Sequence, residues 1–256
     1  MSARAEVIRK CAGLDEIRAC VALQKEVWDF ADIELVPVRT FVAAQKIGGQ
    51  VIGAFEADEL IGFAFALPGY RGGHPYLFSN MLAVREQYRN SGIGRRLKLA
   101  QRDDALARGF ELMEWTFDPL EIKNAYLNLE KLGAIARRYE VNQYGTNTSR
   151  LQGGLPTDRL VAEWWLKSQR VRNLLKNREQ SEFEVLRRIT VPAEIYAWKR
   201  DPETRNRAQE IQDRNRTQFQ KAFAEGLTVL GYEPDPQGSG TFLLGRWDEN
   251  WHYPAD

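Results

Sequence analysis

The sequence has little of what several classes of functional site require. Its 256 residues include only two cysteines, Cys11 and Cys20, and only two histidines. This inventory excludes a histidine-rich or cysteine-based metal centre and a disulfide framework, so we expect no metal. No apolar run approaches the ~20 residues that a membrane helix needs. The first residues also lack an apolar signal core, which predicts a cytoplasmic protein.

The charge composition is nearly balanced. Lysine and arginine number 36 against 35 aspartate and glutamate residues, a net charge of +1. Without a basic surplus we expect no nucleic acid and no membrane surface as partner. Hydrophobic residues make up 43% and charged residues 28%, which is ordinary for a globular protein. The length allows one large domain or two small ones.

Strand and helix patterns alternate along the chain, which predicts a mixed α/β sheet protein. A shift to charged and polar residues at 168–182 indicates a linker or an exposed helix. We therefore predict a domain at residues 1–167 and a C-terminal α/β extension at 168–256 that packs on it. Strands are expected at 5–9, 51–57, 60–67, 76–84, 111–117, 135–139, 160–166, 183–191, 227–232 and 241–247, and helices at 14–30, 39–47, 95–108, 124–132 and 205–223.

The most informative stretch is a glycine-containing turn between a buried strand ending at Val84 and a helix. Gly92 and Gly94 let the main chain bend sharply and approach a ligand closely. The first N–H groups of the helix lack internal partners and lie at its positive end, which suits a diphosphate. Basic side chains surround the turn, although not all need to face a ligand: Arg89, Arg95, Arg96 and Lys98.

Two common phosphate-binding motifs do not fit this turn. A Walker loop needs Lys followed by Ser or Thr after its second glycine, where this chain has Arg95 and Arg96. A dinucleotide fingerprint needs three glycines, and the segment has two. Nucleoside triphosphates and nicotinamide cofactors are therefore disfavoured.

The turn resembles the central motif of the GNAT superfamily of acyl-CoA-dependent N-acyltransferases, Arg/Gln-x-x-Gly-x-Gly/Ala. The matching residues are Arg89, Asn90, Ser91, Gly92, Ile93 and Gly94. The resemblance covers roughly residues 5–166 in element order, with its motifs concentrated between 82 and 133. It implies a GNAT-like, mostly antiparallel central sheet flanked by helices. Segments at 115–120 and 154–159 also resemble one branch of the superfamily that carries a C-terminal extension, and this branch implies no particular substrate.

The resemblance implies acetyl-CoA as cosubstrate. The backbone of Leu82 and Val84 would contact the pantetheine arm. The amides from Arg89 to Gly94, including those of Asn90, Gly92 and Ile93, would hold the pyrophosphate with Arg95 nearby. An amine would then attack the thioester carbonyl directly, and backbone N–H groups of a splayed strand would stabilise the oxyanion.

The second motif of the family is matched only in part. Asn124 stands at the Asn position after the fifth strand, and Lys131-Leu132-Gly133 match the end of the following helix. The position that usually carries the acid tyrosine is Leu129, which cannot donate a proton. Tyr126, one helical turn earlier, is the nearest substitute, and half-buried packing is its alternative role.

Glu114 is the candidate general base, because a carboxylate on the predicted strand 111–117 could take a proton from an ammonium directly or through water. Pairing with an arginine is the alternative role for Glu114. Asp118 and Glu121 are further candidates, and Asp118, just before Pro119, also suits a turn-stabilising role.

The sequence therefore predicts an acetyltransferase that acts on an amine of a small molecule or peptide, with the acceptor undetermined. Two alternatives stay open. A non-catalytic acyl-CoA sensor or partner-binding module would explain Leu129. A nucleotide-phosphate binder on another α/β fold is the second. Pairing of exposed strand edges, giving a homodimer, is a separate expectation.

Overall fold

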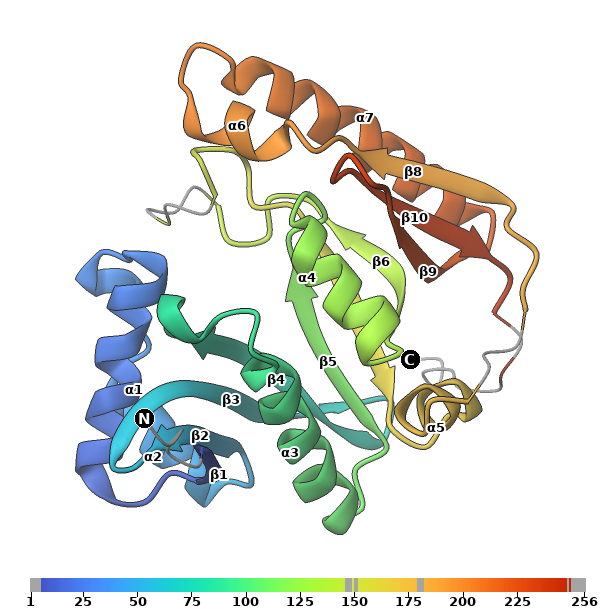
Figure 1. Ribbon diagram of the computed structural model, residues 1–256. Helices are drawn as coiled ribbons and strands as arrows, with labels where there is room; N and C mark the ends of the chain where they lie inside the picture. The colour runs from blue at the N-terminus through green and yellow to red at the C-terminus, as the bar shows by residue number, and fades with distance from the viewer. Residues whose placement is uncertain (1–5, 146–148, 150–151, 179–181, 248, 250–256) are drawn as a thin grey trace. The chain divides into compact units, whose positions relative to one another are not determined.

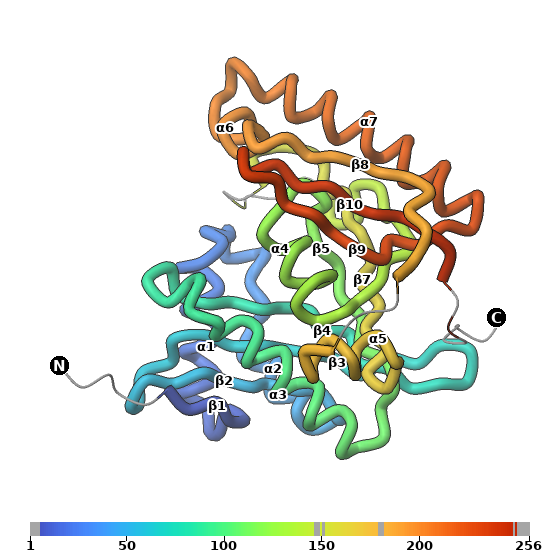
Figure 2. The backbone as a smooth tube through the Cα atoms, turned by 45° about the vertical axis from the view of Figure 1, so that its right-hand side comes forward, coloured from blue at the N-terminus to red at the C-terminus, as the bar shows by residue number. Residues whose placement is uncertain are grey.

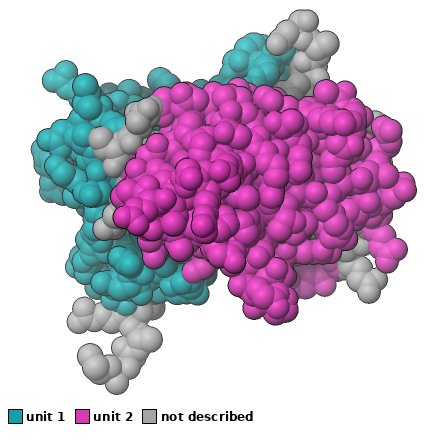
Figure 3. Space-filling model, turned by 90° about the horizontal axis from the view of Figure 1, so that it is seen from above, with its two compact units in different colours: residues 1–114, 253–256 teal, residues 115–252 magenta. Residues whose placement is uncertain are grey.

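The computed structural model describes residues 6–145, 149, 152–178, 182–247 and 249. The chain divides into two compact units, with unit 1 running to Glu114 and unit 2 beginning at Trp115 (Figure 3). Each unit combines strands and helices (Figure 1). The predicted mixed α/β class, with a mostly antiparallel sheet flanked by helices, is confirmed. The predicted domain boundary after residue 167 stays a prediction.

Unit 1 holds a sheet in the order β1-β2-β3-β4-β5, antiparallel except for the parallel pair β4–β5. Its strands are β1 (Glu6–Lys10), β2 (Gln50–Glu56), β3 (Glu59–Arg71), β4 (His74–Val84) and the first half of β5 (Leu112–Phe117). Its helices are α1 (Gly13–Trp28), α2 (Val38–Lys46) and α3 (Ile93–Ala107), with single 3₁₀ turns η1 (Asp32–Glu34) and η2 (Glu86–Tyr88).

Two apolar cores flank this sheet, because side chains of a strand alternate between its faces. Met81 and Ala83 of β4 pack with residues of α1 and α2 in one core. Leu82 and Val84 pack with Ile93 and other residues of α3 in the second core. The alternation along β4 therefore fixes which of its side chains face α3.

Within unit 2 the strand order is β5-β7-β6-β9-β10-β8. Its longest helix, α7, runs along β8 and β10 (Figure 2), and Phe219 of α7 packs edge-on against Phe242 of β10 at 5.2 Å between ring centroids. The strands are β6 (Ile135–Glu140), β7 (Arg159–Trp165), β8 (Arg187–Val191), β9 (Thr228–Pro234) and β10 (Gly240–Gly245). The helices are α4 (Ile122–Tyr126), the π-helical turn η3 (Leu127–Lys131), α5 (Gln169–Leu175), α6 (Ile195–Arg200) and α7 (Arg205–Ala224).

Most differences from the predicted elements are at their ends. Between the predicted strands 60–67 and 76–84 the chain forms a hairpin loop of only two residues, Gly72 and Gly73, both with positive φ (50° and 81°), as a tight hairpin turn requires. The polar stretch 168–182 contains helix α5, capped by Ser168 Oγ, which accepts a hydrogen bond from Val171 N at 3.2 Å. Helix α6 was not predicted, because its six residues are too few for a periodic pattern.

Among the described residues, no helix is both long and apolar enough to span a membrane.

Candidate functional site

The turn between β4 and α3 is not continuous helix. After η2, Arg89 is extended (φ −69°, ψ 153°), and Asn90 has a positive φ of 63°. Gly92 follows at φ 89° as the N-cap of α3, in the left-handed region that favours glycine. The sharp bend predicted between β4 and the helix is therefore present.

The main-chain amides of this turn indicate a binding site for an anion. Within the part of the chain that the structure describes, no backbone N–H from Asn90 to Gly94 donates a hydrogen bond to the protein. The first amide with a helical partner is that of Arg96, which donates to the Gly92 carbonyl at 3.0 Å. Amides of this kind, at the positive end of a 15-residue helix, form a site suited to an anion.

Side chains hold the turn in place without using those amides. The Tyr88 hydroxyl donates to Glu56 of β2 at 2.8 Å, and this bond raises the pKa of Tyr88. The Ser91 hydroxyl donates to the Tyr88 carbonyl at 2.6 Å. Arg89 Nε donates to the Val84 carbonyl at 3.2 Å, which ties the turn to the end of β4.

Only part of the predicted basic cluster lies around the turn. Arg89 is exposed and Arg95 is half-buried. Arg96 instead forms an ion pair with Glu6 of β1. Lys98 is 2% exposed and donates to Ser79 of β4, so its ammonium is inside the unit.

Gly94 lies directly against the predicted pantetheine-binding strand. A Cβ atom placed on Gly94 would be 3.8 Å from Leu82 Cδ2 and 3.9 Å from Val84 Cγ2, ordinary contact distances. A Cβ on Gly92 would meet open space. The structure thus brings together Leu82, Val84 and the glycine turn in unit 1, with Ile93 buried beneath them.

Strand β4 carries a bulge next to this region. Its register with β3 pairs Phe65 with Met81 but Ala66 with Ser79, so Asn80 is an extra residue. The parallel pairing of β4 with β5 comprises Leu77 with Met113 and Phe78 with Glu114.

Glu114, the candidate base, is 1% exposed. Arg71 Nη1 of β3 lies 3.3 Å from each of its carboxylate oxygens, so the alternative role of pairing with an arginine is observed. The same guanidinium lies over the Tyr76 ring at 4.9 Å and donates to its hydroxyl at 3.3 Å.

The residues of the second motif lie in unit 2. Asn124 is exposed on α4. Tyr126 is half-buried, with Lys131 Nζ 4.9 Å from its ring centre. Leu129 is fully buried in the π-helical turn η3. Its neighbour Asn128, which the sequence did not suggest, is 1% exposed, and its Nδ2 has no partner among the described residues.

The alternative carboxylates Asp118 and Glu121 are both bound by Lys199 of α6, whose Nζ is 2.9 Å from an oxygen of each. Asp118 also accepts from Leu120 N at 2.8 Å, the turn-stabilising role predicted for it. Burial alone would raise the pKa of Asp118, but Lys199 and Arg159 outweigh it and lower that pKa below its ordinary value. Lys199 was missed because its partners lie about 80 residues earlier in the chain.

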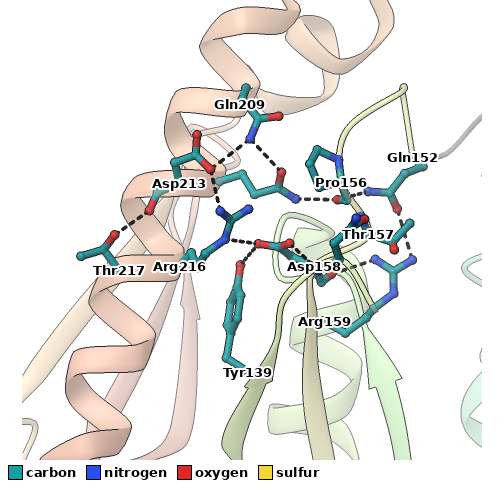
Figure 4. A network of polar contacts seen from close by, with 12 residues as sticks. Tyr139, Gln152, Pro156, Thr157, Asp158, Arg159, Gln209, Asp213, Arg216 and Thr217 are labelled. Atoms are coloured by element: carbon teal, nitrogen blue, oxygen red, sulfur yellow. Dashed lines mark hydrogen bonds and ion pairs between the residues drawn. The ribbon is translucent and has the colours of Figure 1, made fainter. Parts of the chain in front are cut away.

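A second buried carboxylate, Asp158, is held by α7 (Figure 4). It is fully buried and accepts from Arg216 Nε and the Tyr139 hydroxyl, both at 2.7 Å. Burial and the bond to Asp158 raise the pKa of Tyr139. The Pro156 carbonyl nearby accepts from Gln152 and from Gln212 of α7, so the loop before β7 is fixed by the C-terminal helix.

Comparison with known proteins agrees with this arrangement. Residues 17–129 match the model of the acetyltransferase (GNAT) family, which confirms the predicted resemblance. No curated protein matches the chain.

Solved structures share the fold at low sequence identity. A GNAT-family protein from Desulfovibrio desulfuricans is 16% identical with a TM-score of 0.51, covering 63% of this chain and 99% of its own. The ribosomal-protein-S18-alanine N-acetyltransferase of Escherichia coli is 14% identical with a TM-score of 0.50, covering 64% and 96%. A Salmonella typhimurium protein solved with its cofactor acetyl-CoA is 18% identical with a TM-score of 0.52, covering 64% and 96%.

Proposed function

Because the chain carries an acetyltransferase domain of the GNAT family, matched over residues 17–129, we propose that it is an N-acyltransferase. It would move an acetyl group from acetyl-CoA to an amine of a small molecule or peptide. The observation that carries this proposal is the set of main-chain amides from Asn90 to Gly94 that make no hydrogen bond within the described chain.

The cosubstrate would lie along the turn and β4. The amides of Asn90, Gly92, Ile93 and Gly94 would hold the diphosphate, with the cationic side chains of Arg89 and Arg95 beside it. The main chain of Leu82 and Val84 would contact the pantetheine arm, and Asn124 would assist binding. The close approach of Gly94 to Leu82 and Val84 supports a continuous path from the diphosphate to the strand.

The reaction would be direct attack in a ternary complex. Glu114 would remove a proton from the acceptor ammonium, and the neutral amine would attack the thioester carbonyl carbon. Main-chain N–H groups of β4 would stabilise the oxyanion before the carbon–sulfur bond breaks. Tyr126 would donate a proton to the departing thiolate, which needs little help because a thiol pKa is about 8.5. The nitrogen still carries two protons after the attack and would release one of them as the amide forms, and this proton balances the one that Tyr126 donates.

Gly94→Glu tests the diphosphate site. The new side chain has room at its Cβ and no positive φ to strain it, so the fold should persist. Its carboxylate would lie beside the amides and repel the diphosphate. Losing two charge-assisted hydrogen bonds, each worth about 1.5–3 kcal/mol, weakens acetyl-CoA binding at least roughly 100-fold. Isothermal titration measures this loss.

Gly94→Ala is the matched control, since its methyl group fits at the same contact distances without a charge. It should bind acetyl-CoA nearly as wild type does. Wild-type affinity in a folded Gly94→Glu variant would refute the diphosphate site.

An acyl-CoA sensor is the second candidate function, favoured by the burial of Leu129 at the usual acid position. Acetyl transfer to a broad amine panel separates the two. Turnover that falls in Glu114→Gln and Tyr126→Phe supports the enzyme, whereas acetyl-CoA binding without turnover on any amine supports the sensor. Thermal protection by ATP or NAD and not by acetyl-CoA would favour a nucleotide binder instead.

A further inference from the structure

A chain of buried polar side chains connects α3 to strand β4 inside unit 1. Lys98 Nζ donates to the Ser79 hydroxyl at 2.7 Å, and this hydroxyl donates to Gln101 Oε1 at 2.9 Å. Lys98 is 2% exposed, Ser79 4% and Gln101 0%. Gln50 of β2 also contacts Gln101, because its Nε2 donates to the main-chain carbonyl of Gln101 at 2.8 Å. A buried polar chain of this kind is costly unless its geometry is fixed.

Ser79 faces α3 only because of the bulge in β4. Leu82 lies in the core on the α3 side, so in a regular strand the residue two positions earlier, Asn80, would share its face and Ser79 would point to the opposite core. The extra residue at Asn80 shifts the alternation by one position. Ser79 and Leu82, three residues apart, then lie on the same face, and Ser79 reaches Lys98.

The polar chain therefore depends on this register. Burial lowers the pKa of Lys98 well below its ordinary value, which shows how unfavourable the site is for an ammonium. In an unbulged strand, Lys98 and Gln101 would each lose the Ser79 hydroxyl as a partner. Losing hydrogen bonds at buried groups is unfavourable, so the polar chain favours the bulged register.

Helix α3 is common to both ends of the proposed cosubstrate site. Gly94 in its first turn belongs to the diphosphate turn, and Lys98 follows one helical turn later. We propose that Lys98 and Gln101 are positioning residues, which hold Ser79 and so fix the bulged main chain at Asn80 that receives the thioester. This inference rests on the proposed function, since it assigns the bulge a substrate.

The test compares Lys98→Met and Ser79→Ala with wild type, and Ser79→Thr is the control that keeps a hydroxyl. Lys98→Met removes an amine whose burial is unfavourable and fills its place with an apolar side chain of similar shape, so the variant should stay folded. Its affinity for CoA, which lacks the acetyl group, should stay within about twofold of wild type. Its kcat for acetyl transfer should fall about 10- to 100-fold, the size of loss expected when a reacting group is misplaced.

Ser79→Ala should show the same separation, and Ser79→Thr should restore most of kcat. A variant that stays folded and binds CoA normally while losing kcat is not explained by a general loss of packing. Unchanged kcat in Lys98→Met and Ser79→Ala, or an equal loss of affinity for CoA and acetyl-CoA, would overturn the inference.

Nuclear magnetic resonance separates this inference from the proposed function. The amide shifts of Asn80 and Met81 should move in Lys98→Met and stay near wild type in Ser79→Thr, with no cosubstrate present. Unmoved shifts refute the role of Lys98 in holding the bulge. Absence of acetyl-CoA binding by wild type, with moved shifts, refutes the proposed function alone.

Discussion

Replacing Lys199 by methionine removes the cation that two carboxylates share in unit 2. The Lys199 and Asp118 side chains are only 4% and 9% exposed, and their charged atoms are 2.9 Å apart. Glu121, 26% exposed, also lies 2.9 Å from the ammonium. Methionine keeps an unbranched side chain of similar length, so the substitution chiefly leaves Asp118 as a buried carboxylate without its nearest cation.

The expected loss of stability is large for one residue. Removing one partner of a buried ion pair costs about 3–5 kcal/mol, because the other charge stays desolvated. For a chain of this size such a loss lowers Tm by roughly 6–20 °C. An exposed lysine on α4, Lys123, offers a matched control, and Lys123→Met should change the free energy of unfolding by no more than about 0.5 kcal/mol.

The loss should also depend on pH. In wild type the pKa of Asp118 is lowered, so its contribution to stability is present above the ordinary aspartate pKa and lost as pH falls below it. Without Lys199, only Arg159 and the Leu120 amide oppose the effect of burial, so the pKa of Asp118 rises from its wild-type position and this contribution to stability is lost. The difference between wild type and Lys199→Met therefore grows from pH 4 to pH 7.

Urea unfolding followed by tryptophan fluorescence at pH 4.5 and pH 7 measures this difference. The double variant Asp118→Asn with Lys199→Met should recover most of the stability, since it removes the unpaired charge. A loss below about 1 kcal/mol at pH 7, or one that does not change with pH, would contradict the reasoning.

Two further predictions concern buried tyrosine and cysteine side chains. Tyr139→Phe removes a hydrogen-bond donor to Asp158 and should lower the free energy of unfolding by about 1–3 kcal/mol, measured with urea at pH 7. Because the pKa of Tyr139 is raised in the folded protein, wild type should lose stability above pH 10, and the variant should lose less. Cys11 and Cys20 are buried with their sulfurs 3.9 Å apart, and the hydrogen bond between them together with burial raises the pKa of Cys20. A thiol reagent should label neither cysteine until urea unfolds the protein, and rapid labelling of the native protein would contradict their burial.

The parts of the site that the sequence predicted are local in the chain. The turn around Gly92 follows from a strand, a glycine that tolerates positive φ and a helix start, all within about ten residues. A turn of this kind can be predicted from neighbouring residues in the sequence, without knowing which other elements pack against it.

The parts that the sequence did not predict depend on distant partners. Lys98 was expected near the diphosphate turn, yet it reaches Ser79 because a bulge in the pairing with β3 rotates that serine toward α3. Lys199 and Arg216 neutralise Asp118 and Asp158, which lie 81 and 58 positions earlier. A strand register and a long-range ion pair leave no short motif, so only the folded chain reveals them.

The anchoring of two buried carboxylates by α6 and α7 bears on how the chain tolerates shortening. A fragment that ends at residue 167 keeps Asp118 and Asp158 but lacks Lys199 and Arg216, the basic residues that neutralise them. In this fragment the loop around Pro156 would lack the helix that covers it, and the Pro156 carbonyl would lose its hydrogen bond from Gln212. Helices α6 and α7 thus stabilise segments near the middle of the chain, and insertions or deletions between them are expected to cost more stability than local loop length alone would suggest.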